Sequence, residues 1–212
     1  MNQSIAQLVS NMDKNHDGVI LIGISGAPGA GKSTLALEIV DELNQEDAMT
    51  AQFCPMDGYH YTNQELSEKN LTQYKGRIDT FDVKEMQKDI DKLRQGEKPF
   101  YWPIYSRELH DPVNEGVEIS AKTRVFIVEG NYIFFDEGEW RHIRDSFDFK
   151  IFIDIPTETL KKRLIKRHLA GGKSEKEALH KVINTDLPNA ILIRNSAMSA
   201  DVIINSTGQV LE

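Results

Sequence analysis

The residues best suited to chemistry stand in one run, residues 26–33, which reads Gly-Ala-Pro-Gly-Ala-Gly-Lys-Ser and fits the pattern G-x-x-x-x-G-K-S. Glycines in such a run leave backbone N–H groups free to surround a phosphate, and the helix that follows adds its positive end. The Lys32 ammonium can reach the β- and γ-phosphates, and the Ser33 hydroxyl can bind Mg²⁺. The run therefore predicts a loop that binds Mg-ATP through Gly26, Ala27, Pro28, Gly29, Ala30, Gly31, Lys32, Ser33 and Thr34.

A reactive carboxylate follows the second apolar run of the chain. Asp57 lies in the segment Met-Asp-Gly-Tyr-His, just after Phe53 and Cys54. Ligands of open α/β sheets bind beyond the carboxyl ends of the strands, so we expect Asp57 to face the phosphate loop. It can accept the proton of an attacking hydroxyl or hold Mg²⁺ through water, and the sequence does not separate these roles. A plain Asp-Gly turn is the alternative.

A second acid is predicted beside the metal. Glu129 follows the apolar run 125–128, at the position where P-loop proteins place the acid that orients Mg²⁺. A strand that ends in an acid by chance is the alternative. The predicted metal site therefore consists of Ser33, Glu129 and Asp57.

Basic residues gather on one predicted helix. Arg163 and Arg167 are one turn apart and lie beside the apolar stripe of that helix, near its packed edge. Two glycines follow at 171–172, a suitable hinge for a lid that closes over phosphates. We therefore predict that at least one of the two arginines neutralises charge on the transferred group, whereas Lys161 and Lys162 belong to a solvated face.

The apolar pattern predicts how these residues are positioned. Short apolar runs typical of buried strands cover 19–24, 53–54, 125–128, 149–153 and 202–204, and helices are predicted over 32–43, 83–93, 157–169 and 175–182. Alternation of this kind requires an α/β fold with a parallel sheet covered on both faces, here a P-loop NTPase three-layer α/β/α sandwich. We expect one domain over 1–212, with an irregular, aromatic-rich insert at about 59–120 for the substrate and a lid at about 163–178.

Composition limits the class of protein. The 212-residue chain carries a net charge of −8, which argues against an extended nucleic-acid surface. Its single cysteine, Cys54, excludes an intrachain disulfide and fits a reducing compartment. Residues 1–17 contain no apolar signal core, and no run approaches the roughly 20 apolar residues of a membrane helix. We expect a cytoplasmic protein that binds neither membrane nor nucleic acid.

The remaining candidates are contacts for the molecule that accepts the phosphate. Two flank Asp57 in sequence and four lie in the predicted insert, where they can bind a polar or anionic group. Each is equally suited to a surface or packing role. They are Tyr59, His60, Arg77, Tyr105, Arg107 and His110.

Taken together, these segments resemble the phosphoribulokinase/uridine kinase family of P-loop kinases, and most of all its pantothenate-kinase-like branch. The resemblance covers residues 23–204 and rests on 26–33, 56–60, 75–82, 103–107 and 128–132. It implies a five-stranded parallel sheet with a helical lid, often a homodimer, and an ATP-dependent transfer to a hydroxyl of a small metabolite. It also implies Asp57 as catalytic base, Ser33 and Glu129 at Mg²⁺, Arg163 or Arg167 at the phosphates, and adenine near 205–208.

Three functions stay open on the sequence. The first is a kinase for a pantothenate-like, nucleoside-like or sugar-like hydroxyl. The second is a uridine or nucleoside kinase specifically, although residues 56–60 differ from the Pro-Asp-Ser-Phe-Tyr type of segment in uridine kinases. The third is a P-loop ATPase switch that acts on a protein partner. The Asn-Lys-x-Asp segment of GTPases and the Leu-Ser-Gly-Gly of ABC ATPases are both absent.

Overall fold

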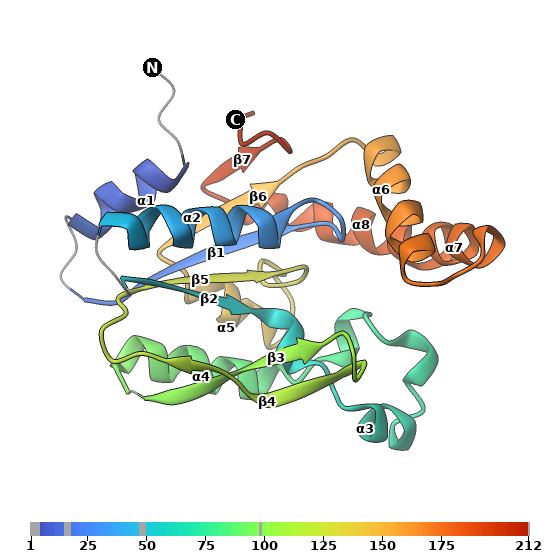
Figure 1. The fold of residues 1–212 in the computed structure, drawn as a ribbon, viewed down its shortest axis with the longest axis horizontal. Helices are drawn as coiled ribbons and strands as arrows, with labels where there is room; N and C mark the ends of the chain where they lie inside the picture. The colour runs from blue at the N-terminus through green and yellow to red at the C-terminus, as the bar shows by residue number, and fades with distance from the viewer. Residues whose placement is uncertain (1–4, 15–17, 47–49, 98, 212) are drawn as a thin grey trace.

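A parallel sheet of five strands forms the centre of the computed structural model, which describes residues 5–14, 18–46, 50–97 and 99–211 (Figure 1). The strand order is β2-β5-β1-β6-β7, and each neighbouring pair is parallel. Every predicted strand is present, which confirms the predicted sheet. The strands are β1 (Ile20–Gly26), β2 (Ala51–Pro55), β5 (Val125–Gly130), β6 (Phe149–Ile153) and β7 (Val202–Ile204).

Helices cover both faces of this sheet because alternate side chains of each strand point in opposite directions. Ile20 and Ile22 of β1 pack in the cluster that contains helices α1 (Ile5–Lys14) and α2 (Lys32–Glu46). Leu21, between them, packs in a second cluster with α4 (Val83–Gln95) and α5 (Trp140–Asp145). The three-layer sandwich is therefore confirmed. No helix was predicted where α1 lies, and the rest of the segment 1–17 is outside the described residues.

The aromatic-rich part of the insert is regular, so the prediction of an irregular passage was wrong. Strands β3 (Phe100–Ser106) and β4 (Asp111–Ile119) pair as an antiparallel hairpin outside the main sheet. Pro103 has no N–H group to donate to the partner strand, but the pairing shifts register between Trp102 and Ile104 and so accommodates it. The hairpin packs closely on the 3₁₀ helix Met56–Tyr59 that follows β2, because a Cβ on Gly58 would be 2.1 Å from the Pro103 carbonyl oxygen.

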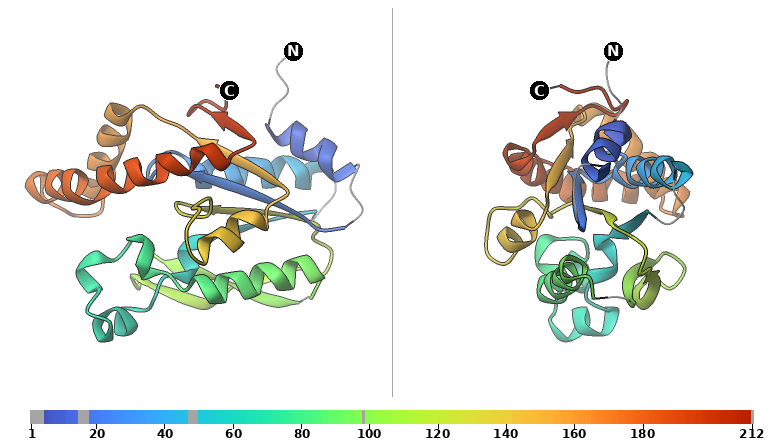
Figure 2. Two further views of the ribbon diagram at one scale, coloured as in Figure 1. Left: turned by 180° about the vertical axis from the view of Figure 1, so that it is seen from behind. Right: turned by 90° about the vertical axis from the view of Figure 1, so that its left-hand side faces the viewer.

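Between β2 and α4 the chain makes a closed excursion over residues 61–80. His60 and Phe81 form an isolated antiparallel bridge at its base, and the Tyr61 N–H donates to the Thr80 carbonyl at 3.0 Å. Its helix α3 (Asn63–Glu68) begins with a capping box of Thr62 and Glu65. The excursion is therefore held at both ends and projects as one unit beyond the carboxyl ends of the strands (Figures 1 and 2).

The predicted lid consists of helices that project from the same end of the sheet as α3 (Figures 1 and 2). Helix α6 (Thr157–Ala170) and helix α7 (Glu175–Lys181) agree with the predicted helices. A π-helical segment, Val182–Asp186, then joins α7 to α8 (Leu187–Arg194) without a break. No signal in the sequence indicated this π-helix. No helix in the described part of the chain is long and apolar enough to cross a membrane.

Candidate active site

The glycine-rich run forms the loop between β1 and α2, as its motif predicted. Gly29 and Gly31 have positive φ angles of 81° and 109°, which glycine adopts without strain. A Cβ on Gly26 would lie 2.7 Å from the Ile153 carbonyl oxygen, so the loop can leave the sheet here only with glycine. Helix α2 starts at Lys32, immediately after the loop. Its N-terminal N–H groups and positive dipole end are thus presented to whatever the loop holds.

Strand register brings the two predicted acids to this loop. Glu129 on β5 pairs with Ile24 of β1 on one side and with Pro55 of β2 on the other. The Ser33 hydroxyl donates to Glu129 Oε1 at 3.2 Å. Asp57 lies two residues beyond Pro55, in the short 3₁₀ helix Met56–Tyr59, and is partly exposed. Residues from three segments therefore meet at one edge of the sheet.

The Lys32 ammonium is held by a residue that sequence reasoning gave no role. Lys32 Nζ donates to Asn131 Oδ1 at 2.7 Å and to the Ala27 carbonyl at 3.2 Å. The Asn131 carbonyl in turn accepts from the Ser25 hydroxyl at 3.2 Å. Asn131 therefore ties the end of β5 to the phosphate loop. Its only sequence signal was its place in the motif 128–132.

Burial dominates the electrostatics of this group. Lys32 and Glu129 are only 8% and 6% exposed. Burial lowers the pKa of Lys32, although the carboxylates of Glu129 and Asp57 oppose the shift. Burial also raises the pKa of Glu129, against the attraction of Lys32. Burial therefore destabilises both charged side chains while no ligand is bound. Such destabilised charges are typical of functional sites that bind further charged groups.

This cost predicts that Glu129→Gln stabilises the ligand-free protein. A raised pKa means that the folded chain holds the Glu129 proton more tightly than the unfolded chain, so its ionisation lowers stability as the pH rises above the ordinary value of 4.5. Glutamine removes the charge and can still accept from Ser33. We expect a higher unfolding temperature at pH 7.5, by about 2–4 °C for each kcal/mol recovered.

Calorimetry of both proteins between pH 4 and 8 measures this effect. The gain should shrink as the pH falls toward 4.5, where Glu129 itself becomes neutral. A variant that is less stable than the parent at pH 7.5 would show that the attraction of Lys32 outweighs burial.

The two arginines of helix α6 have different surroundings. Arg163 donates through Nη1 to the carbonyl oxygens of Gly29 and Ala30, at 3.2 and 3.3 Å, and so ties the helix to the phosphate loop. Leu164 packs beside it, 3.4 Å from where a Cβ on Gly29 would lie. Arg167 is exposed. Its charge adds to the lowering of the Lys32 pKa and opposes the rise of the Glu129 pKa.

The end of the lid helix carries a contact that the sequence did not reveal. His168 Nε2 and Asp186 Oδ2 are 2.6 Å apart, and both side chains are largely buried. The pair joins α6 to the π-helical segment. Asp186 therefore helps to hold the lid helix against the segment that follows α7.

Tyr59 lies in the core, unlike its predicted place in an acceptor site. It is 3% exposed, its hydroxyl donates to Asp89 Oδ2 at 2.8 Å, and its ring meets Trp102 edge to face. His60 points elsewhere: its ring stacks on Phe81 with centroids 3.9 Å apart. Burial lowers the pKa of His60, opposed by Asp57. His60 therefore stays a candidate for the acceptor site, and we do not retain Tyr59.

The four candidates in the insert have three kinds of surroundings. Tyr105 is half-buried and its ring meets His60 at 5.5 Å between centroids. Arg77 donates two hydrogen bonds of 2.6 Å to the Asp79 carboxylate. Its positive charge, which was expected to bind an anionic acceptor, is thus paired with Asp79. Arg107 and His110 are exposed at the turn of the hairpin. The structure therefore brings only Tyr105 and His60 into contact with one another.

The segment implied for adenine is a tight loop after β7. Asn205 Oδ1 accepts the N–H groups of Thr207 and Gln209, at 2.9 and 3.0 Å. This loop is joined to the end of β6, because the Asp154 N–H donates to the Ile204 carbonyl at 2.8 Å.

The donors near the loop suit Mg²⁺ bound together with a nucleotide. Ser33 and Glu129 offer a hydroxyl and a carboxylate, the hard oxygen ligands that Mg²⁺ prefers. Among the described residues, no group of three or more histidine, cysteine or acidic side chains could hold a metal ion. A site of this kind is completed by phosphate oxygens and water, as is usual for Mg²⁺ in phosphoryl-transfer enzymes.

A five-stranded parallel sheet, a glycine-rich phosphate loop between β1 and α2, and helices that project beyond the carboxyl ends of the strands define a P-loop NTPase fold. The chain belongs to the phosphoribulokinase/uridine kinase family, whose model matches residues 21–211. This confirms the family that the motifs had indicated. The chain is accordingly a kinase.

Its relatives fit the same class. YggC of Escherichia coli (strain K12), an uncharacterized protein, is 34% identical over 188 residues, or 88% of this chain and 78% of that protein. The uridine kinase of Clostridium tetani is 32% identical over 198 residues, covering 89% and 88%. Proteins named pantothenate kinase match over about half of their own length. A crystal structure of a proposed fructose transport system kinase from Silicibacter sp. TM1040 has a TM-score of 0.86 and 30% identity, covering 96% and 100%.

Proposed function

We propose that this chain transfers the γ-phosphate of Mg-ATP to a hydroxyl group of a small sugar-like, nucleoside-like or pantothenate-like metabolite. One observation carries the proposal: the phosphate loop, the Ser33–Glu129 contact of 3.2 Å and Asp57 stand at adjoining strand ends. A phosphate donor, a metal and a proton acceptor are needed together at such a place.

In this proposal the loop residues hold the phosphates of ATP, and Lys32 exchanges its contact with Asn131 for the β- and γ-phosphates. Ser33 and Glu129 would hold Mg²⁺, which neutralises charge on the phosphates when it is bound. Arg167, on the lid, would help to neutralise the same charge, because its own charge already acts on Lys32 and Glu129. Because Lys32 and Glu129 are already buried, the site supplies these charges with little reorganisation.

Asp57 acts as the general base. The acceptor oxygen forms a bond to the γ-phosphorus while the bond between that phosphorus and the β–γ bridging oxygen breaks. The electron pair leaves with ADP, and the acceptor proton passes to the Asp57 carboxylate. Asp57 is partly exposed and acts electrostatically on His60, whose ring meets Tyr105, so we place the acceptor hydroxyl near these residues.

The test is ADP release from Mg-ATP with D-fructose, D-ribose, uridine, pantothenate or D-glycerate added singly. D-fructose is tried first, because a structure proposed to be a fructose transport system kinase is 30% identical and fully covered by this chain. Uridine follows, because a uridine kinase is 32% identical. We expect one acceptor to raise the rate of ADP release at least tenfold. An acceptor that is bound and oriented reacts in an effectively unimolecular step, with an effective molarity of about 10⁵ M or more. Mass spectrometry should then detect its phosphate ester.

Slow ADP release that no acceptor changes would count against this proposal. It would favour the alternative of a P-loop ATPase switch, in which hydrolysis is timed by a protein partner.

A further inference from the structure

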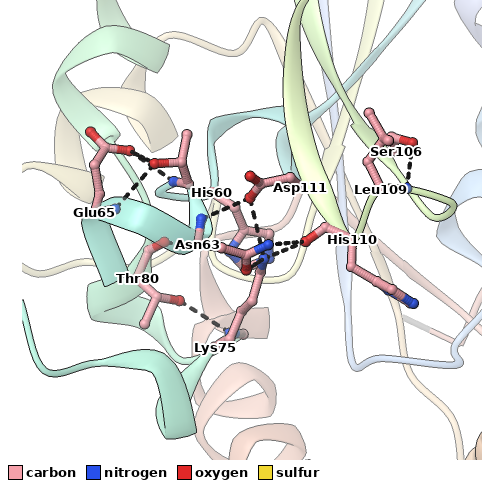
Figure 3. Close-up of polar contacts among 11 residues, drawn as sticks. His60, Asn63, Glu65, Lys75, Thr80, Ser106, Leu109, His110 and Asp111 are labelled. Carbon is pink, nitrogen blue, oxygen red and sulfur yellow. Dashed lines mark hydrogen bonds and ion pairs between the residues drawn. The ribbon is translucent and has the colours of Figure 1, made fainter. Parts of the chain in front are cut away.

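Two segments on the acceptor side of the site are joined by a network centred on one lysine (Figure 3). One segment is the closed excursion over residues 61–80. The other is the turn of the β3–β4 hairpin, whose residue His110 has a left-handed φ of 52°. Lys75 belongs to the sequence motif 75–82, yet the proposed chemistry gives it no role.

The Lys75 ammonium binds both segments at once. Its Nζ donates to Asn63 Oδ1 at 2.7 Å within the excursion and to the His110 carbonyl at 2.7 Å in the hairpin turn. Asp111 Oδ1 lies 3.6 Å from the same nitrogen. Asn63 closes the network, because its backbone N–H donates to Asp111 Oδ1 at 2.8 Å and its side chain to the His110 carbonyl at 3.1 Å.

This network is next to the residues that flank Asp57. The Lys75 ammonium lies 5.1 Å from the centre of the Tyr105 ring, within the range of a cation–π contact. Tyr105 in turn meets the His60 ring at 5.5 Å, and the His60 N–H donates to the Asp57 carbonyl at 3.4 Å. A change in the position of the hairpin turn would therefore move Tyr105 and the acceptor side of Asp57.

The excursion is also attached to the body of the protein near its end, where Ile78 packs against the second core cluster. Besides its base, the Tyr132 hydroxyl donates to the Gly76 carbonyl at 2.9 Å. Lys75 is the neighbour of Gly76, so the segment is fixed on two sides at this point. One side leads to the end of β5 and the other to the hairpin.

We propose that Lys75 is a positioning residue, which clamps the excursion 61–80 to the hairpin turn and thereby sets the acceptor side of the site without touching ATP. The effect on the acceptor rests on the proposed kinase function. The clamp itself does not.

The experiment compares Lys75→Met, which keeps the length of the side chain, with Lys75→Arg, which keeps the charge. Lys69→Met is the matched control, because Lys69 lies in the same excursion and its ammonium is 4.7 Å from the centre of the Tyr61 ring. Amide hydrogen exchange is followed at Asn63 and Leu109, whose N–H groups donate to Asp111 and to the Ser106 hydroxyl. We expect exchange at both to rise about tenfold in Lys75→Met, as for the loss of a charged hydrogen bond, with partial rescue in Lys75→Arg.

Steady-state kinetics with D-fructose and with uridine then measure the effect on the acceptor. Lys75→Met should raise the KM of the acceptor about tenfold and leave the KM of ATP unchanged. Unchanged exchange at Asn63 and Leu109 would overturn the clamp, whatever the activity. Faster exchange with an unchanged acceptor KM would overturn the positioning role. If the unaltered protein phosphorylates neither probe, the proposed function fails for them, and exchange still decides whether Lys75 clamps the two segments.

Discussion

Asp57→Asn is expected to lower acceptor-dependent ADP release by about 10²–10⁴-fold, the usual contribution of a general base. Asparagine has nearly the same shape but cannot take the acceptor proton. Asp57 follows β2 in the 3₁₀ helix Met56–Tyr59, whose fold depends on the Gly58 and Tyr59 contacts rather than on the Asp57 side chain. The variant should therefore fold and bind ATP like the parent. The fall in activity should appear as a lower kcat.

Asp91→Asn is the matched control, because Asp91 is an exposed acid on α4. Kinetics at saturating and at limiting Mg²⁺ separate the two roles open to Asp57. A rate that recovers at high Mg²⁺ would make Asp57 a metal ligand, and a rate close to the parent's at all Mg²⁺ concentrations would remove Asp57 from the chemistry.

Much of the fold was predictable because the buried strands are apolar on both faces. The runs at 149–153 and 202–204 gave β6 and β7 with their observed bounds. The hairpin was missed for a local reason, since Pro103 interrupts β3 and only the register shift beside it allows pairing. The π-helical segment 182–186 has no distinctive composition, and it depends on packing that a linear pattern does not contain.

The site was predictable where a motif fixes both residue type and position. The phosphate loop, Glu129 and Asp57 follow from a strand-loop-helix unit and from the carboxyl ends of neighbouring strands. The contacts that hold them were not, because each joins distant positions. Lys32 and Asn131 are 99 residues apart, and Lys75 and His110 are 35 apart. Tyr59 was misplaced because sequence gives no direction to a side chain in a 3₁₀ turn.

The two arginines of the lid helix lead to a prediction in which their contacts decide the kinetic effect. Arg163 holds two carbonyl oxygens of the phosphate loop, so it supports the shape of the ATP site. Arg167 lies one turn further along, is exposed, and acts on Lys32 and Glu129 through its charge alone. A free guanidinium near the proposed γ-phosphate can stabilise the charge that spreads over it during transfer.

We therefore expect Arg167→Met to reduce kcat by about 10³-fold, the lower end of the effect of losing a catalytic arginine, with little change in the KM of ATP. Arg163→Met should instead weaken ATP binding about tenfold, because the loop loses its two bonds to the helix. Lys162→Met, an exposed change on the same helix, should alter neither. Initial rates over a range of ATP concentrations measure all three variants. If Arg163→Met lowers kcat while Arg167→Met behaves like Lys162→Met, the two roles are reversed. Arg163 must then exchange its contacts with Gly29 and Ala30 for the transferred phosphate when the lid closes.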